Sequence, residues 1–263
     1  MRQTGKLVRA IFASIAGIAS GLHAAFAQDA ATSGGMQFLV TPYLWLSGIN
    51  ATTKTPLARE PEVSSDVSAI DLLSHLSGVP FMGSAEIRDG PFGLLGDVLH
   101  VPVSTTIRTR DVLFRGGKAA LATNTGTALF LYRALEEPLQ FADIGGGFRA
   151  WGFSMNLNLN AGLLPATTVS RSAGWGDPLL AGRYHRELGN GFGLTAYGDV
   201  GGFGVGAHVD WQVVGTIDYA LNPSTNLRLG YRSLNFNYQS SGGFDLGFNV
   251  HMKGPILAAT FRF

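Results

Sequence analysis

The residues best suited to chemistry are charged side chains of both signs at alternating positions along apolar segments. The acids are Glu86, Asp97, Asp143, Asp177, Asp199 and Asp218, and the bases are Arg88, Arg133, Arg149, Arg183, Arg228 and Arg232. A buried charge is costly unless an opposite charge pairs with it. Because the two signs are balanced, we expect a paired charge network that fills an interior. A polar, weakly selective pore is the alternative use of the same residues.

The sequence gives less support for a catalytic site or a metal site than for this charge network. Beyond residue 27 the histidines are His75, His100, His185, His208 and His251, and no Gly-x-Ser-x-Gly segment is present. The absence of Cys excludes thiolate zinc sites and thiol nucleophiles. No spaced His/Asp cluster predicts a metal site, and the glycine runs at 145–147 and 201–206 open no helix that would bind phosphate. We therefore expect no enzymatic activity, no cofactor and no metal.

The composition narrows the class of protein. Charged residues make up 14% of the chain, hydrophobic residues 46%, and 36 of the 263 residues are Gly. With 19 Lys and Arg against 18 Asp and Glu, no basic nucleic-acid surface is expected. The apolar content excludes a disordered chain.

The positioning elements have a period of two. In the segment 211–221, Trp211, Val213 and Ile217 share one parity, while Gln212 and Asp218 share the other. This alternation predicts a strand with one apolar and one polar face. Ten such segments follow along the chain, near 36–53, 78–89, 92–106, 118–134, 139–158, 173–187, 192–206, 209–221, 226–239 and 244–263.

The connections alternate between short and long. Tight-turn sequences lie at 88–91, 136–138, 188–191 and 222–225, and longer links lie near 55–77, 107–117, 159–172 and 240–243, with a short exception at 206–208. A helical period predicts a short helix at 66–78. This pattern predicts an all-β, up-and-down antiparallel transmembrane barrel of about ten strands, with eight or twelve as alternatives.

The last two strands break the alternation. Leu227, Leu229 and Tyr231 are odd-numbered, whereas Leu234 and Phe236 are even-numbered. The last strand shifts in the same way, between Leu257 and Met252. One interpretation is a β-bulge in each strand. The other is that both strands rise above the bilayer and line the outer half of the barrel with apolar groups.

The first segment resembles a secretory signal peptide. Arg2, Lys6 and Arg9 precede the apolar run 11–19, and Ala25-Phe26-Ala27 is a cleavage site of the A-x-A type. We expect residues 1–27 to be removed, residues 28–35 to be a short linker and residues 36–263 to form one barrel domain.

The end of the chain carries the most specific motif. Leu257, Ala259, Phe261 and Phe263 form an apolar stripe that ends on an aromatic carboxy-terminus, and this stripe resembles the assembly signal of bacterial outer-membrane β-barrels. Together with Thr41–Trp45, Asp143–Arg149, Asp199–Phe203 and Gly230–Arg232, it makes the chain similar to small outer-membrane barrels of the OmpW or opacity-protein kind. The resemblance implies location in the outer membrane and recognition by the barrel assembly machinery.

Aromatic residues fit the interfacial girdles of such a barrel. We expect Trp45, Trp151, Trp175 and Trp211, with Tyr43, Tyr184 and Tyr231, at the two membrane interfaces, although simple packing also explains several of them.

These inferences predict a non-enzymatic outer-membrane barrel with a structural role, or with narrow passage or binding of a small apolar or polar solute. Its partners would be the lipid bilayer and the assembly machinery, with no nucleic acid. A lipid-modifying barrel enzyme is one alternative, and it would need a Ser/His pair at the outer rim. A soluble periplasmic lipocalin-like barrel is the other, and it would need an inward apolar face.

The terminal stripe generates a prediction about assembly. Deleting Phe263 lowers the amount of folded barrel in the outer membrane, because it removes the last aromatic of the stripe. Arg262→Gln, which leaves the stripe intact, has a milder effect. Heat-modifiable mobility on gels measures both amounts, and unchanged assembly after the deletion contradicts the assignment.

Overall fold

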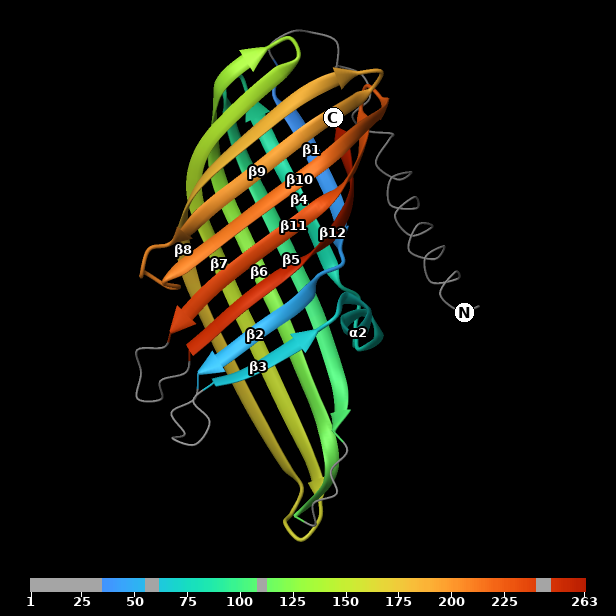
Figure 1. Ribbon diagram of the computed structural model, residues 1–263, viewed down its shortest axis with the longest axis vertical. Coiled ribbons are helices and arrows are strands. Elements are labelled where there is room, and N and C mark those ends of the chain that lie inside the picture. Colours follow the sequence, from blue (N-terminus) through green and yellow to red (C-terminus); the bar gives the residue numbers. More distant parts are fainter. Residues whose placement is uncertain (1–34, 55–61, 108–112, 240–246) are drawn as a thin grey trace.

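The computed structural model describes residues 35–54, 62–107, 113–239 and 247–263. Within them the chain forms twelve strands and one short helix (Figure 1): β1 (Gln37–Trp45), β2 (Gly48–Lys54), β3 (Glu62–Val67), α2 (Ala69–Ser74), β4 (Phe81–Asp89), β5 (Phe92–Ile107), β6 (Phe114–Glu137), β7 (Gln140–Ala161), β8 (Thr167–Gly189), β9 (Phe192–Gly202), β10 (Val209–Asn222), β11 (Thr225–Gln239) and β12 (Gly247–Arg262). The predicted signal peptide at 1–27, most of the linker at 28–35 and the link at 240–243 lie outside the described residues.

Ten strands close into an antiparallel barrel. The order runs from β1 to β4 and then through each strand in sequence to β12, which pairs with β1 and closes the ring. The hairpin of β2 and β3 extends the sheet beside β12. The predicted all-β class, up-and-down order and ten-strand barrel are therefore confirmed. No helix in the described part of the chain has the length and hydropathy needed to span a membrane.

The tight turns gather at one end of the barrel, at the top of Figure 1, together with the end of β12 and the start of β1. We call this end the turn end and the opposite end the loop end. Gly90, Asn190 and Gly191 have positive φ angles in two of these turns. Glycine and asparagine tolerate that conformation best, which explains why the turns could be predicted.

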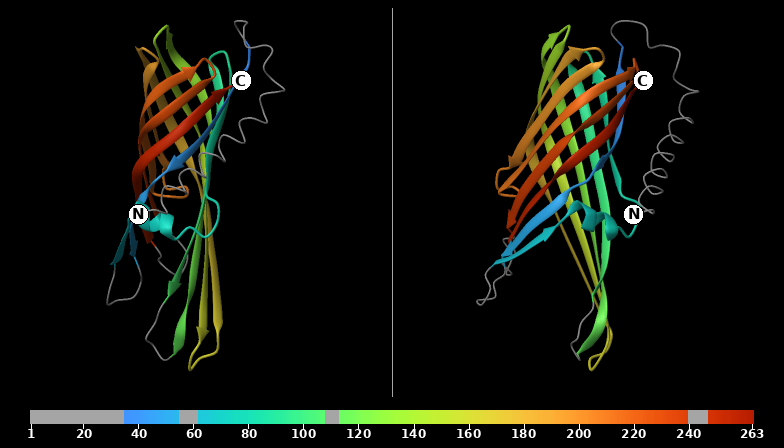
Figure 2. Two further views of the ribbon diagram at one scale, coloured as in Figure 1. Left: turned by 90° about the vertical axis from the view of Figure 1, so that its right-hand side faces the viewer. Right: turned by 45° about the vertical axis from the view of Figure 1, so that its right-hand side comes forward.

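Three strands extend far beyond the others toward the loop end (Figure 2). β6, β7 and β8 contain 24, 22 and 23 residues. The predicted link at 159–172 is therefore wrong, because β7 continues to Ala161 and β8 begins at Thr167. Its polar residues belong to strands: Thr168 bonds to Asn158 and Ser170 to Asn156 across the outer face.

The first predicted strand is two strands. β1 pairs with the turn-end part of β12, as far as Trp45 opposite Ile256. β2 then continues along β12 after a break at residues 46–47, while β4 pairs with β1 and β5 and not with β2. The predicted helix at 66–78 is shorter than expected, since α2 covers 69–74. The chain after it pairs with β5 through Leu76 opposite Val103.

The outer face changes polarity along the strands. Near the turn end its side chains are apolar and exposed; they include Phe38, Val40, Ile87, Leu94, Val98, Phe130, Ile144, Phe148, Leu180, Leu194, Val200, Val213, Ile217, Leu229, Tyr231 and Leu257. We call this ring the apolar belt. Beyond it, outward positions carry Ser, Thr and Asn, such as Asn156 and Ser170, which are exposed.

The inner face changes in the opposite sense. β11 and β12 pair without a register shift from Thr225 opposite Phe261 to Gln239 opposite Gly247. Leu234, Phe236 and Met252 are buried inside the barrel on the same parity as the charged Arg232. The bulge interpretation is therefore wrong, and the interpretation of an apolar lining in the outer half of the barrel is confirmed.

This lining corrects the predicted aromatic girdles. Trp45 and Trp151 are each 3% exposed and lie in an interior apolar cluster, with Trp175 and Tyr43 packed against it. Tyr184 and Tyr231 are exposed on the outer face. Trp211 shares the outward parity of Val213. The girdle prediction is therefore wrong for Trp45, Trp151, Trp175 and Tyr43, because their side chains face the interior of the barrel.

Close packing between β6 and β7 generates a prediction. A Cβ on Gly147 would collide with the Ala128 carbonyl oxygen, so Gly147→Ala forces the two strands apart. We expect a loss of about 1–3 kcal/mol in unfolding free energy, measured by denaturant titration in detergent. Gly126→Ala on β6 is the control, because its Cβ meets nothing within 4 Å. Equal stability of the two variants would contradict this packing.

Candidate functional site

The interior near the turn end is organised around Asp143, which is 1% exposed. Its carboxylate accepts from Arg133 Nε at 2.6 Å, Arg183 Nε at 2.9 Å and Arg88 Nη2 at 3.0 Å. Glu86 holds two of the same arginines, with Arg183 Nη1 at 2.6 Å and Arg88 Nη2 at 3.0 Å. These residues come from β4, β6, β7 and β8, so the network crosses the lumen.

A second group surrounds Arg149, which is also 1% exposed. Its Nη1 donates to Asp210 at 2.6 Å and its Nη2 to Asp199 at 2.7 Å. The same carboxylates accept from Trp151 Nε1 at 3.0 Å and Tyr197 Oη at 2.6 Å. The guanidinium therefore ties β7 to β9 and β10.

Arg232 makes the third connection, from β11 to β1 and β10. It donates to Tyr43 Oη at 2.9 Å and to Gln212 Oε1 at 2.8 Å, and Asp97 lies 3.7 Å from its Nη2. Its guanidinium carbon also lies 4.6 Å from the ring centroid of Trp45, a cation–π distance.

The remaining predicted charges have separate partners. Asp218 accepts from the Thr195 and Thr216 hydroxyls, and Arg228 Nε lies 3.6 Å from it, which is too long for a hydrogen bond. Asp177 accepts from the Trp175 indole at 2.9 Å and from the Ala207 backbone N–H at 2.6 Å. Asp177 thereby fixes the connection between β9 and β10.

All twelve charged residues singled out in the sequence thus face the interior, where they form several groups. Sequence reasoning missed Asp210, which is fully buried and pairs with Arg149. It shares the parity of Gln212 and Asp218 on β10, and that parity was available in the sequence. Three uncharged residues also belong to these groups: Tyr197 donates to Asp199 on its own strand, Gln212 bonds to Asp199 and Arg232 on the neighbouring strands, and Tyr43 accepts from Arg232.

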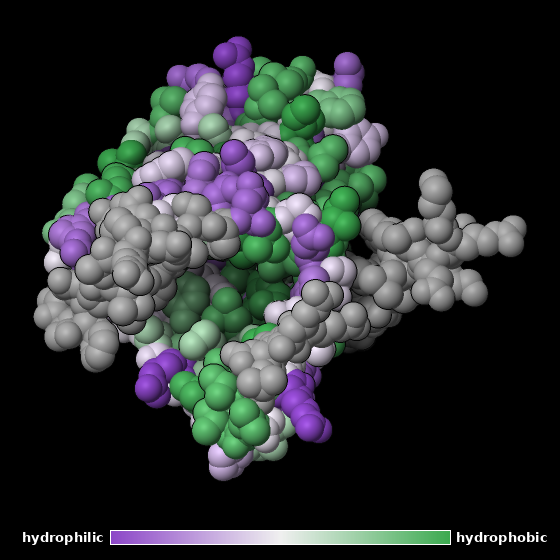
Figure 3. Space-filling model, turned by 60° about the horizontal axis from the view of Figure 1, so that its bottom comes forward, coloured by the Kyte–Doolittle hydropathy of each residue, from purple (hydrophilic) through white to green (hydrophobic). Residues whose placement is uncertain are grey.

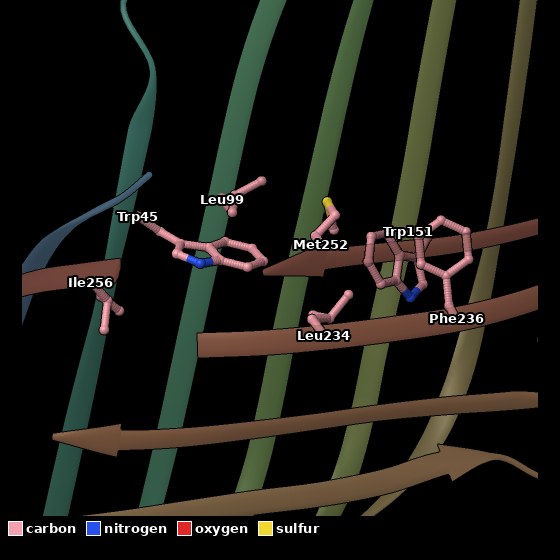
Figure 4. Close-up of a cluster of buried hydrophobic side chains, with 7 residues drawn as sticks. All are labelled: Trp45, Leu99, Trp151, Leu234, Phe236, Met252 and Ile256. Atoms are coloured by element: carbon pink, nitrogen blue, oxygen red, sulfur yellow. The ribbon is translucent and has the colours of Figure 1, made fainter. Parts of the chain in front are cut away.

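Beyond these charges the lumen becomes apolar. Buried Trp45, Leu99, Trp151, Leu234, Phe236, Met252 and Ile256 form one cluster across the barrel (Figure 4). Half-buried Phe153, Trp175 and Tyr238 pack against it toward the loop end, with Trp175 and Tyr238 stacked at 4.1 Å between ring centroids. Figure 3, seen from the loop end, shows a hollow lined by apolar residues. We call this space the vestibule.

A small apolar pocket adjoins the vestibule in the barrel wall. It lies where β1 parts from β4, beneath α2, and Leu72, Leu76, Met82 and Val101 line it. Trp45 belongs both to this pocket and to the vestibule cluster. α2 therefore covers the wall where the strands separate.

The histidines lie apart from one another. His185 is inside, bonded to Thr195, and His100 bonds to Asn124 on the outer face. His75 belongs to the end of α2, and His208 lies in the connection between β9 and β10. His251 Nε2 lies 2.8 Å from Ser233 Oγ on the outer face, a contact that the sequence did not reveal. Among the described residues, no group of three or more His, Asp or Glu could hold a metal ion.

Comparison with known proteins defines the fold. No protein-family model and no curated protein sequence matches the chain. The outer-membrane protease OmpT from Escherichia coli matches in structure with a TM-score of 0.55 at 8% identity, over 90% of this chain and 99% of that chain. The chain folds as a small outer-membrane β-barrel. Two further matches, Ail of Yersinia pestis (TM-score 0.35, 11% identity, 88% and 100% covered) and the Pseudomonas putida toluene transporter TodX (0.36, 8%, 89% and 91%), add no argument about function.

The identification orients the molecule. In outer-membrane barrels short turns face the periplasm, so the turn end is periplasmic and the loop end is extracellular. The apolar belt is the surface in contact with lipid, which excludes the soluble lipocalin-like alternative. Leu257 is exposed on this belt, and Ala259 and Phe261 alternate with the buried Ala258 and Thr260. Their role as an assembly signal, with Phe263, stays a prediction.

The outer-membrane barrel offers a direct test of its interior network. Arg149→Ala leaves Asp199 and Asp210 buried without their shared cation, and breaking a buried pair in this way costs about 3–5 kcal/mol. Denaturant unfolding of the purified barrel should show that loss. Arg171→Ala is the control, because Arg171 is exposed and, within the part of the chain that the structure describes, donates only to the neighbouring Ser170 carbonyl. A loss below about 1 kcal/mol would show that the pairs are replaceable by water.

Proposed function

We propose that this barrel binds a small apolar solute, one with an aromatic ring for example, in the vestibule at its extracellular end. The observation that carries the proposal is the lining. Inward positions on β7, β8, β11 and β12 carry Trp, Phe, Tyr and Met where the outer face is already polar. Barrel interiors are ordinarily polar, so the barrel fold alone does not require this arrangement.

The vestibule has the properties of a binding site for such a solute. Phe153, Trp175 and Tyr238 are only half-buried, so their rings retain surface that a ligand can cover. Covering that surface is favourable by about 25 cal/mol per Å². The rings already pack on one another, with 4.1–5.9 Å between centroids, so a ligand ring would stack on the exposed surface of this group.

The charged groups below the vestibule form its floor. Arg149 joins β7 to β10, Arg183 joins β8 to β4, and Arg232 of β11 lies 3.7 Å from Asp97 of β5, so these groups bridge the lumen. This arrangement favours binding over passage of polar solutes. In planar bilayers we expect no stable current steps from the purified barrel, and regular steps would support the pore alternative.

Ligand binding is tested with N-phenyl-1-naphthylamine, a fluorescent apolar probe that accepts energy from tryptophan. The barrel is placed in nanodiscs, and empty nanodiscs provide the partition background. We expect saturable energy transfer, because Trp151 and Trp175 line the vestibule. Phe153→Asn weakens binding about tenfold, since it places an amide among the rings.

Phe203→Asn is the matched control. Phe203 is 58% exposed in the connection between β9 and β10 and is not part of the vestibule cluster. Binding that is non-saturable, or that Phe153→Asn and Phe203→Asn affect equally, would overturn the proposal.

A further inference from the structure

The outer face of the barrel carries a second arrangement, separate from the vestibule. We infer that Ser233 and His251 form a catalytic pair that hydrolyses carboxylic esters of lipids in the outer leaflet. Ser233 Oγ and His251 Nε2 lie 2.8 Å apart on neighbouring strands β11 and β12. A serine hydroxyl at this distance from an imidazole nitrogen can pass its proton to the ring and become a nucleophile. This activity departs from the expectation that the chain is not an enzyme.

The height of the pair on the barrel points to lipid. Tyr231 and Leu229, the next outward residues of β11 toward the periplasm, are 51% and 61% exposed and belong to the apolar belt. Ser233 is thus the first polar outward residue above the belt on its strand. In a bilayer, ester groups lie at the boundary between the acyl chains and the headgroups. The pair therefore faces the level at which lipid esters lie.

The serine hydroxyl is poorly committed to other partners. Among the described residues, His251 is its one hydrogen-bond partner. By contrast, the hydroxyl of Ser74, beside His75, donates to the Asp71 carbonyl oxygen, and that of Thr195, beside His185, donates to Asp218. Those two hydroxyls donate their protons to other acceptors, so they are not activated in the same way.

The neighbours supply the other parts of an ester-hydrolysing site. Asn50 of β2 is paired in register with His251 and shares its outward parity, so it is placed to orient the imidazole ring. Lys253 is exposed and in register with Ser233. Its positive charge can stabilise the negative charge that develops on the ester carbonyl oxygen when Ser233 attacks. Trp211 packs near His251, with 5.9 Å between ring centroids. Asn50 is a positioning residue in this scheme.

The reaction needs water as its only co-reactant. His251 takes the proton of Ser233, and Oγ attacks the ester carbonyl carbon. The bond to the alcohol breaks, His251 returns the proton to the departing alkoxide, and the acyl group stays on Ser233. Water then attacks the acyl group with His251 again as base, which releases a carboxylic acid and restores the serine hydroxyl.

A fluorophosphonate probe tests the pair, because it phosphonylates activated serines with loss of fluoride. The full mature barrel in nanodiscs is labelled and the modified residue is located by peptide mass spectrometry. We expect the adduct on Ser233, and labelling at least about 100-fold slower in His251→Gln. Ser172→Ala, which removes an exposed outer-face serine of β8, leaves labelling unchanged. The wild-type measurement decides the matter even if a variant folds poorly: no adduct on Ser233 overturns the inference.

A second measurement identifies the lipid. Fatty-acid release is followed from phosphatidylethanolamine nanodiscs and from liposomes that contain lipopolysaccharide, because both lipids carry acyl esters. Release from either, lost in Ser233→Ala, supports the inference and names the substrate. Release from neither overturns the assignment to lipid. Ser172→Ala leaves the hydrolysis unchanged. The vestibule proposal is read out by energy transfer and this one by fatty-acid release and labelling of Ser233, so failure of one is distinguishable from failure of the other.

Discussion

The structure depends on a mismatch between strand length and bilayer thickness. A membrane-spanning strand needs about 9–11 residues, whereas β7 has 22. Side chains alternate along the whole strand, so one set of residues must face lipid over half its length and water over the other half. Because no bulge in the middle of the strand reverses which residues point outward, the environment changes along each face and the residue types must change with it. The outer face therefore passes from apolar to polar, and the inner face passes from charged to apolar at about the same height.

The charged floor and the apolar vestibule share residues, so the two halves of the interior are structurally coupled. Trp151 donates to Asp210 in the charged floor and packs against Phe236 in the vestibule, with 4.4 Å between ring centroids. Trp45 lies beneath the Arg232 guanidinium and also belongs to the vestibule cluster. Buried ion pairs add little net stability, but they are costly to break, so they favour one arrangement of the strands. The position of the aromatic rings follows from that arrangement.

Much of the fold was predictable because it rests on local rules. Alternation identified the strands, the Gly- and Asn-containing turns identified the periplasmic end, and parity placed Arg149 and Asp199 inside. The polar residues Thr168 and Ser170 were assigned to a link, because outward polar residues on a strand above the membrane have the same composition as a loop. Trp45, Trp151 and Trp175 were misplaced for a related reason, since an aromatic residue suits both an interfacial girdle and an apolar lumen. The contact between Ser233 and His251 depends on the register of two strands, which neither segment specifies alone.

The branched pairing of β12 separates two kinds of constraint. Its periplasmic part pairs with β1 in a ring that has no free edge, and its extracellular part pairs with β2 in a hairpin attached at one side. The ring is where an edge would be exposed to lipid, so changes there affect membrane insertion as a whole. The hairpin and α2 stand beyond that ring, where water can satisfy the backbone. Mutations that alter the shape of the extracellular half therefore have less effect on insertion, so related barrels can evolve different recognition surfaces on the same membrane-embedded base.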